Sequence, residues 1–153
     1  MSGAERREQI TAEIMARTGI TEPMIERLVH GFYAKVRSDA VLAPVFEARI
    51  QDWEPHLQRM CAFWSSVALM SGRYQGTPMA KHAPLPVDAG HFDRWLSLFE
   101  TTAQELCPPQ AATHFVELAR RIAASLELGI AGAQGVMLGK DERFRRYPAG
   151  AVQ

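Results

Sequence analysis

The chain has 153 residues, of which 47% are hydrophobic and 22% are charged. Lys and Arg together number 17, as do Asp and Glu, so the formal net charge is +0 at pH 7 and no nucleic-acid partner is expected. This length and composition are typical of one folded domain, which buries about 70% of the surface of its unfolded chain.

No stretch approaches the roughly 18 uninterrupted apolar residues of a membrane span. The first ten residues, MSGAERREQI, contain charges where a secretory signal would be apolar. We therefore expect a cytoplasmic protein without a membrane partner. Cys61 and Cys107 lack the CxxC spacing, so we expect two small thiols rather than a disulfide or a thiolate metal site.

Capping residues mark the first two predicted helices. Ser2 and Glu5 have the spacing of a capping box, which predicts a helix over residues 4–18. Threonine, glutamate and proline at 21–23 are typical of a helix start, and the second helix ends at residues 38–39. Apolar residues recur along this helix at helical spacing, with a tyrosine at the border of the face: Ile25, Leu28, Val29, Phe32, Val36 and Tyr33.

The middle of the chain contains a connector, a long helix and a short turn. Residues 42–46 indicate a short turn of helix or a loop, with Phe46 directed inward. Asp52 is a suitable N-cap for a central helix over residues 53–71. A loop rich in glycine and proline follows. A helical turn over residues 77–82 comes next, and two later prolines prevent its extension.

Two further helices complete the predicted all-α fold. Asp88 begins a helix that ends near Leu106 and has a strongly aromatic face, made of Phe92, Trp95, Leu96 and Phe99. The last helix, residues 109–129, is predicted to stop at Gly129. Residues 130–153 lose the helical periodicity and are expected to form a flexible tail. No segment has the alternating pattern of a strand.

Two histidines are the main candidates for chemistry. His56 begins a helical face that continues with Met60, Phe63 and Val67, and the glycine-rich loop lets His82 face the same slot from the opposite side. Two imidazoles beside an apolar slot suit an iron porphyrin, with His82 as the proximal ligand. The simpler alternatives are that His82 lies on the surface and that His56 is solvated or caps its helix.

Three other side chains have a functional and a structural interpretation. The hydroxyl of Tyr33 and the indole N–H of Trp95 either satisfy the core or donate hydrogen bonds to a bound ligand. Arg59 lies at the edge of the apolar face, where it either pairs with a haem propionate or is solvated. The chain contains no GxGxxG, P-loop, HExxH or GxSxG motif, which leaves the imidazoles as the candidate chemistry.

An ordered set of motifs resembles a known family. The motifs are GFYAKV at 31–36, LAPVF at 42–46, WEPH at 53–56, the run from Gly72 to His82, and FDRWLSLFE at 92–100. Together they resemble the group III truncated haemoglobins over about residues 23–128. The absence of the Gly-Gly motifs of groups I and II suits this assignment.

The resemblance implies a globin-like two-over-two helical sandwich around haem b. It divides the chain into an N-terminal extension helix (1–22), a truncated globin haem domain (23–129) and the tail (130–153). It implies that His82 is the metal ligand and that Tyr33, His56 and Trp95 form the distal ligand-binding side. The residues it implies for haem contact are Phe32, Met60, Phe63, Met79, Phe92 and Trp95, and Arg59 joins them as the candidate propionate partner.

Three classes of function remain open from the sequence. The first is binding of O₂, CO, NO or a similar small ligand at a five-coordinate iron, with slow release caused by the donors of Tyr33 and Trp95. The second is a haem enzyme of the peroxidase or nitric oxide dioxygenase type. The third is a helical interaction module without haem, which would lack a Soret band. For the first two we expect an unidentified reductase as partner, and a monomer or weak dimer.

Overall fold

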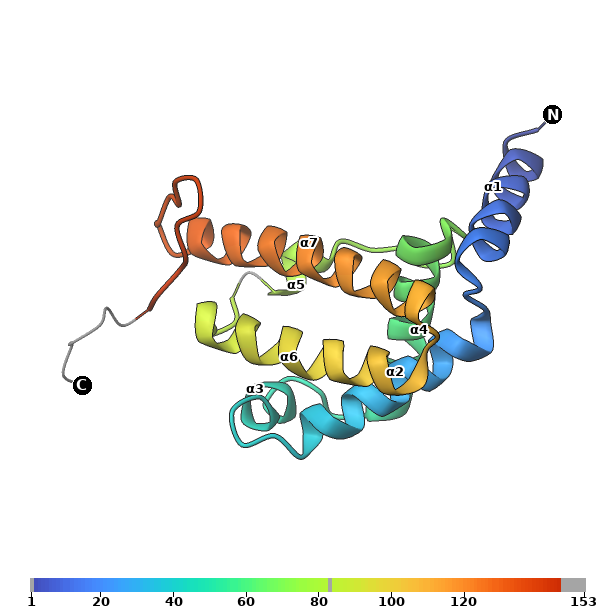
Figure 1. The fold of residues 1–153 in the computed structure, drawn as a ribbon. Helices are drawn as coiled ribbons and strands as arrows, with labels where there is room; N and C mark the ends of the chain where they lie inside the picture. The colour runs from blue at the N-terminus through green and yellow to red at the C-terminus, as the bar shows by residue number, and fades with distance from the viewer. Residues whose placement is uncertain (1, 83, 147–153) are drawn as a thin grey trace.

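The computed structural model describes residues 2–82 and 84–146 (Figure 1). In these residues it contains seven helices and no strand, which confirms the all-α prediction. The helices are α1 (Gly3–Thr18), α2 (Glu22–Arg37), α3 (Ala43–Glu47), α4 (Trp53–Leu69), α5 (Pro78–His82), α6 (Ala89–Leu106) and α7 (Pro109–Ala133). No helix of this described part is long and apolar enough to cross a membrane.

Local capping explains where the first helices begin and end. The Ser2 hydroxyl accepts a hydrogen bond from the backbone N–H of Glu5 at 3.1 Å, and Thr21 does the same for Met24 at 3.2 Å. Helix α1 ends at Gly19, whose φ of 75° is the left-handed conformation that glycine adopts without strain. Helix α4 ends at Leu69, two residues earlier than predicted, because Met70 adopts a left-handed φ of 56°.

The two-over-two sandwich is formed by α2, α4, α6 and α7. Helix α2 packs on α4 and α6, while α7 packs on α6 and α4. Figure 1 shows α6 and α7 side by side, with α2 crossing next to α6. Helix α1 projects from one end, and the Thr11 hydroxyl ties it to the carbonyl of Leu69 at 2.7 Å.

Aromatic rings fill the centre of the sandwich. Phe99 of α6 is 1% exposed and stacks on Trp64 of α4 and on Trp95, with centroid distances of 4.8 Å and 5.5 Å. Phe32 of α2 meets Phe99 edge-on at 5.3 Å. Each such pair contributes about 0.5–1.5 kcal/mol beyond the burial of its area, so this cluster joins α2, α4 and α6.

The predicted end of the last helix at Gly129 is wrong, because α7 continues to Ala133. A glycine inside a helix costs about 1 kcal/mol relative to alanine, so its sequence signal resembles a stop. Here Gly129 permits a close approach. A Cβ added to it would collide with the side chain of Met79 in α5. Gly129 therefore leaves room for the end of the Met79 side chain where α5 meets α7.

The structure also differs from the predicted tail over residues 130–146. Residues 130–133 complete α7, and the following segment returns towards the start of α6, where the side chain of Phe144 is 2% exposed. Arg143, which lies in the predicted tail, is paired with Glu127 and Asp93. The rest of the predicted tail, residues 147–153, lies outside the described residues.

An ion pair fixes the corner between α2 and α3. The side chain of Asp39 is 2% exposed and accepts hydrogen bonds from the Nε of Arg94 at 2.6 Å and from the backbone N–H groups of Val41 and Leu42 at 3.1 Å and 3.0 Å. The hydrogen bond from Arg94 lowers the pKa of this carboxyl. The corner is thereby attached to α6.

We expect Asp39→Asn to destabilise the fold at pH 7 and to have a smaller effect at pH 3. The pKa of Asp39 is lower in the folded chain than the value of about 3.9 in an unfolded chain. Its carboxylate therefore contributes stability above that value, and the contribution is lost as the pH falls through the folded-state pKa. Urea unfolding at the two pH values measures this difference.

Asp141→Asn is the matched control for Asp39→Asn. Asp141 is exposed and has a φ of 63°, a conformation that asparagine tolerates well. The free energy of unfolding of the Asp141→Asn variant should differ from that of the parent protein by less than about 0.5 kcal/mol at either pH. Equal destabilisation by Asp39→Asn at pH 7 and pH 3 would contradict an ionic role for Asp39.

Candidate functional site

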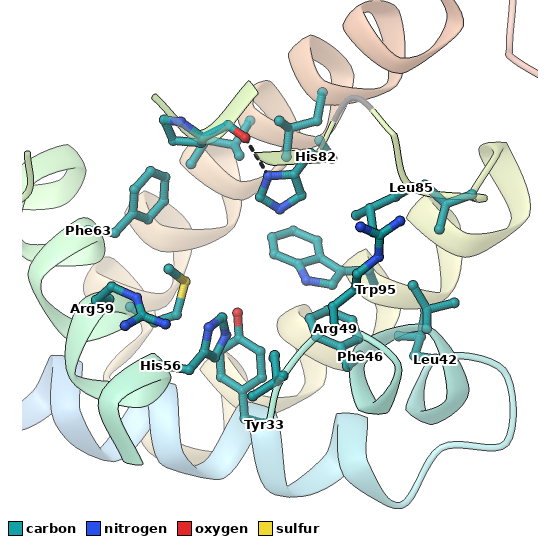
Figure 2. Close-up of a pocket in the computed structure, with 18 of the residues that line it drawn as sticks. Tyr33, Leu42, Phe46, Arg49, His56, Arg59, Phe63, His82, Leu85 and Trp95 are labelled. Atoms are coloured by element: carbon teal, nitrogen blue, oxygen red, sulfur yellow. Dashed lines mark hydrogen bonds between the residues drawn. The ribbon is translucent and has the colours of Figure 1, made fainter. Parts of the chain in front are cut away.

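A cavity of about 650 Å³ lies between α2, α4, α6 and α7, with α5 at one side (Figure 2). Pockets that bind small molecules and cofactors commonly have volumes of about 300–1,000 Å³ and mostly apolar walls. Most of the predicted site residues line this cavity: Tyr33, His56, Arg59, Met60, Phe63, His82, Phe92 and Trp95.

Two predicted contact residues, Phe32 and Met79, are not among the residues that line the cavity. Phe32 lies behind the wall, edge-on to the rings of Tyr33 and Trp95 at 5.0 Å and 5.3 Å. Phe32 precedes Tyr33 in α2, so its side chain points about 100° away from that of Tyr33 around the helix axis and enters the core. Met79 instead contacts α7 at Gly129.

The orientation of His82 is set by its own short helix. Its Nδ1 lies 2.6 Å from the carbonyl oxygen of Pro78, four residues earlier. A carbonyl oxygen only accepts, so Nδ1 carries a proton, and in the neutral ring the lone pair then lies on Nε2. Figure 2 shows the opposite edge of the ring directed into the cavity. This is the arrangement in which an imidazole can ligate a metal while its other nitrogen donates to a backbone carbonyl.

The opposite side of the cavity is an aromatic cluster. The ring of Tyr33 lies 5.2 Å from that of His56, 5.8 Å from that of Phe46 and 5.9 Å from that of Trp53. Arg37 covers the outer face of Trp53, with its guanidinium carbon 4.6 Å from the ring centroid. These contacts hold the Tyr33 ring in one orientation, with its hydroxyl directed into the cavity (Figure 2).

Tyr33 stays protonated at neutral pH. Burial raises the pKa of its phenol well above the ordinary value, and the neighbouring Cys61 adds to the shift. Burial also raises the pKa of the Cys61 thiol to about 11, so Cys61 is likewise neutral. Within the described part of the chain, the Tyr33 hydroxyl makes no hydrogen bond. A neutral phenol therefore offers its proton to whatever occupies the cavity.

Trp95 forms the wall between these two sides. It stacks on Phe99 with an interplanar angle of 13°, and Figure 2 shows it between His82 and Tyr33. Its packing against the core fixes the ring in place. The indole N–H is the second candidate donor in the cavity.

Two arginines lie at the cavity. Arg59 extends from α4, as predicted, and Arg49 follows α3 and donates from Nη2 to the carbonyl of Pro84 at 3.4 Å. Sequence reasoning missed Arg49. The available signal was its position one helical turn after Phe46, a residue predicted to point inward. Tyr74, Leu126 and Ile130 were also missed, because their approach to the cavity depends on tertiary packing.

The residues of the cavity fit a haem better than a bare metal ion. Among the described residues, no three His, Cys, Asp or Glu side chains are grouped so that they could hold an ion. A porphyrin brings its own ring of nitrogen ligands and needs an axial ligand from the protein, which the imidazole of His82 can provide. The apolar walls suit the macrocycle, and the two guanidinium groups suit its carboxylates.

Comparisons with known proteins show the family to which the chain belongs. Residues 17–126 match the bacterial-like globin family. A group 3 truncated haemoglobin from Campylobacter jejuni is 31% identical in an alignment of 113 residues, which covers 71% of this chain and 89% of that protein. The crystal structure of the group III truncated haemoglobin from this organism matches with a TM-score of 0.66.

Two more distant structures share the fold. Each is 24% identical to the chain and covers 74% of it. The haemoglobin from Thermobifida fusca matches over 94% of its own length with a TM-score of 0.62, and the haemoglobin from Chloroflexus aurantiacus over 95% with a TM-score of 0.61. At this identity the likeness supports the architecture.

The chain therefore belongs to the bacterial-like globin family. Within that class, the resemblance of its motifs to the group III truncated haemoglobins is confirmed. Membership of a globin family implies a haem cofactor and a small gaseous ligand.

Proposed function

We propose that this globin binds a diatomic ligand such as O₂, CO or NO at haem b, with His82 as proximal ligand and Tyr33, Trp95 and His56 on the distal side. When bound, the haem supplies an iron with one open coordination position. The observation that supports the proposal best is the pairing of two oriented groups across one cavity. These groups are the Nε2 lone pair of His82 and the neutral hydroxyl of Tyr33.

On the proximal side, the backbone carbonyl of Pro78 has two effects on His82. It fixes the tautomer, and it holds the ring so that Nε2 faces the cavity. Hydrogen bonds of this kind also increase the basicity of a ligating imidazole. The prolines at 78 and 84 restrict the backbone on both sides of this segment.

On the distal side, Tyr33 and Trp95 can each donate a hydrogen bond to a polarised ligand. A buried hydrogen bond of this type contributes about 1–3 kcal/mol when its loss leaves a partner unsatisfied. Two such donors would slow release of the ligand, which argues against rapid oxygen delivery. Met60, Phe63 and Phe92 supply apolar walls, and Arg59 is the proposed partner of a haem propionate.

His56 is proposed to control entry. Its ring meets the rings of Tyr33 and Trp53 edge-on at 5.2 Å and 5.7 Å, and it lines the cavity from the first turn of α4. A ligand that enters past α4 must therefore displace this ring.

A second candidate is a haem enzyme of the peroxidase or nitric oxide dioxygenase type. The contact between His56 and Tyr33 favours it, because an imidazole beside a phenol can accept and return protons at one end of the cavity. Peroxidase turnover that falls on His56→Leu, with unchanged haem content, would support the enzyme over simple ligand binding.

We expect His82→Ala to lose stable haem, because the chain then offers no axial imidazole from α5. Haem content is measured by the pyridine haemochrome assay, which also identifies haem b. His30→Ala is the matched control, since His30 makes the same hydrogen bond to a carbonyl four residues earlier but is exposed. Full haem occupancy and an unchanged ferrous spectrum in His82→Ala would exclude His82 as proximal ligand.

We expect Tyr33→Phe to keep haem and to release O₂ at least about tenfold faster, because one buried donor of about 1.4 kcal/mol is removed. Stopped-flow kinetics measures the release rate. Tyr74→Phe removes a second phenol that lines the cavity and should leave the rate unchanged. If Tyr33→Phe has no effect on the release rate, the double variant with Trp95→Phe is measured. Faster release in the double variant would mean that Trp95 alone stabilises the ligand, and an unchanged rate would mean that neither side chain donates to it.

We expect His56→Leu to change the rate of ligand association more than the rate of dissociation. The substitution removes the contacts of the imidazole ring with Tyr33 and Trp53, which should lower the barrier to ligand entry. Laser photolysis measures association, and the ferrous spectrum should be five-coordinate in both proteins. A six-coordinate low-spin spectrum in the parent that becomes five-coordinate in His56→Leu would instead make His56 an internal ligand.

A further inference from the structure

The segment after α7 contains a feature that lies beyond the family-matched residues 17–126. We name residues 134–146 the C-terminal strap. After Gly135, at a φ of 82°, the chain turns back, and Figure 1 shows it beside the end of α7. The strap buries Phe144, which belongs to a second apolar cluster with Val87, Phe92, Ala123, Ile130 and Ala131.

An ion pair with a buried carboxylate anchors the strap to α7. The side chain of Glu127 is 7% exposed. Its carboxylate oxygens accept from the Nε of Arg143 at 3.2 Å and 2.9 Å, and one of them also accepts from the backbone N–H of Phe144 at 2.9 Å. A carboxylate on the inner face of a helix is costly unless it is paired. Glu127 is therefore a residue whose burial depends on the strap.

The same arginine and its neighbour attach the strap to the start of α6. The Nη2 of Arg143 donates to Asp93 at 2.8 Å and to the carbonyl of Ala89 at 3.3 Å. The backbone N–H of Ala89 donates to the carbonyl of Phe144 at 2.7 Å. One guanidinium thus joins α6 and α7, and Glu127 and Asp93 raise its pKa, so it stays charged.

The strap reaches His82 through the segment that follows α5. Val87 belongs to the apolar cluster of Phe144, and Leu85 packs against this cluster. Both residues also line the cavity. The backbone N–H of Leu85 donates to the carbonyl of His82 at 2.9 Å, and that of Val87 to Leu85 at 3.0 Å. Phe144 itself does not line the cavity. Phe144 packs against Leu85 and Val87 on the side of these residues that faces away from the cavity.

We propose that the C-terminal strap positions His82, with Arg143 and Phe144 as positioning residues outside the cavity. The strap fixes the backbone of residues 84–89 against α7, and this backbone fixes the place of His82 relative to the distal wall. The inference rests on the proposed role of His82 as proximal ligand. It adds to that role a dependence on residues beyond the part of the chain that matches the family.

Full-length variants of the strap test the proposal. Arg143→Ala removes the ionic anchor and Phe144→Ala the apolar one, while Phe144→Leu retains most of the apolar contact. Arg120→Ala is the matched control, because Arg120 also lies on an ion pair involving α6 and α7, but this pair is exposed and outside the cavity. Asp93→Asn, which removes one surface partner of Arg143, is a mild variant that keeps the test valid if a stronger variant fails to fold.

Three measurements distinguish a positioning role of the strap from general support of the fold. Hydrogen exchange of the haem-free protein should become faster at residues 84–89 in Arg143→Ala and Phe144→Ala. The iron–histidine stretching band of the unliganded ferrous protein should shift in the same variants, and haem release should accelerate at least about tenfold, the change that about 1.4 kcal/mol produces. Phe144→Leu and Arg120→Ala should resemble the parent in all three measurements.

The outcomes separate this inference from the function on which it rests. Faster exchange with an unchanged iron–histidine band would overturn the positioning role and leave the strap as a purely structural element. Unchanged exchange at residues 84–89 would overturn it as well. If His82→Ala keeps the iron–histidine band of the parent, the assignment of His82 fails first, whatever the strap variants do.

Discussion

The structure depends on a stack of aromatic rings that joins three helices, α2, α4 and α6, and holds them at fixed distances from one another. Trp64, Phe99 and Trp95 lie nearly parallel, and Phe32 closes the stack edge-on. Protein interiors otherwise pack without large voids. A cavity of about 650 Å³ therefore needs rigid walls. The stack provides one, because its members contact the sandwich core on one side and the cavity, through Trp95, on the other.

Polar contacts extend this rigid centre to the periphery through two adjacent residues of α6. Arg94 holds the buried carboxylate of Asp39 at the corner between α2 and α3, and Asp93 receives Arg143 from the C-terminal strap. Consecutive positions on a helix point about 100° apart, so one turn of α6 holds two different segments. The corner between α2 and α3 and the C-terminal strap are thus tied to the same helix.

Much of this architecture could be predicted from local sequence. Capping residues and apolar periodicity act over a few positions, so the helices and the shared face of His56, Met60 and Phe63 followed from spacing. The remainder required tertiary information. Gly129 has the propensity of a helix stop, yet contact with Met79 decides its role. Arg143 and Glu127 are separated by 16 residues in a stretch without periodicity, and a single Phe144 is too weak a signal for a buried segment.

The C-terminal strap also has a consequence for the order in which the protein is completed during synthesis. Arg143 contacts the carbonyl of Ala89 across 54 residues. A ribosome releases the chain from its N-terminus, so α5 and the following loop emerge well before the residues that hold them. The contacts between this loop and the C-terminal strap can form only after residues 134–146 have emerged. Until then the aromatic centre of α2, α4 and α6 can already form, while the loop after α5 lacks the contacts that Arg143 and Phe144 provide.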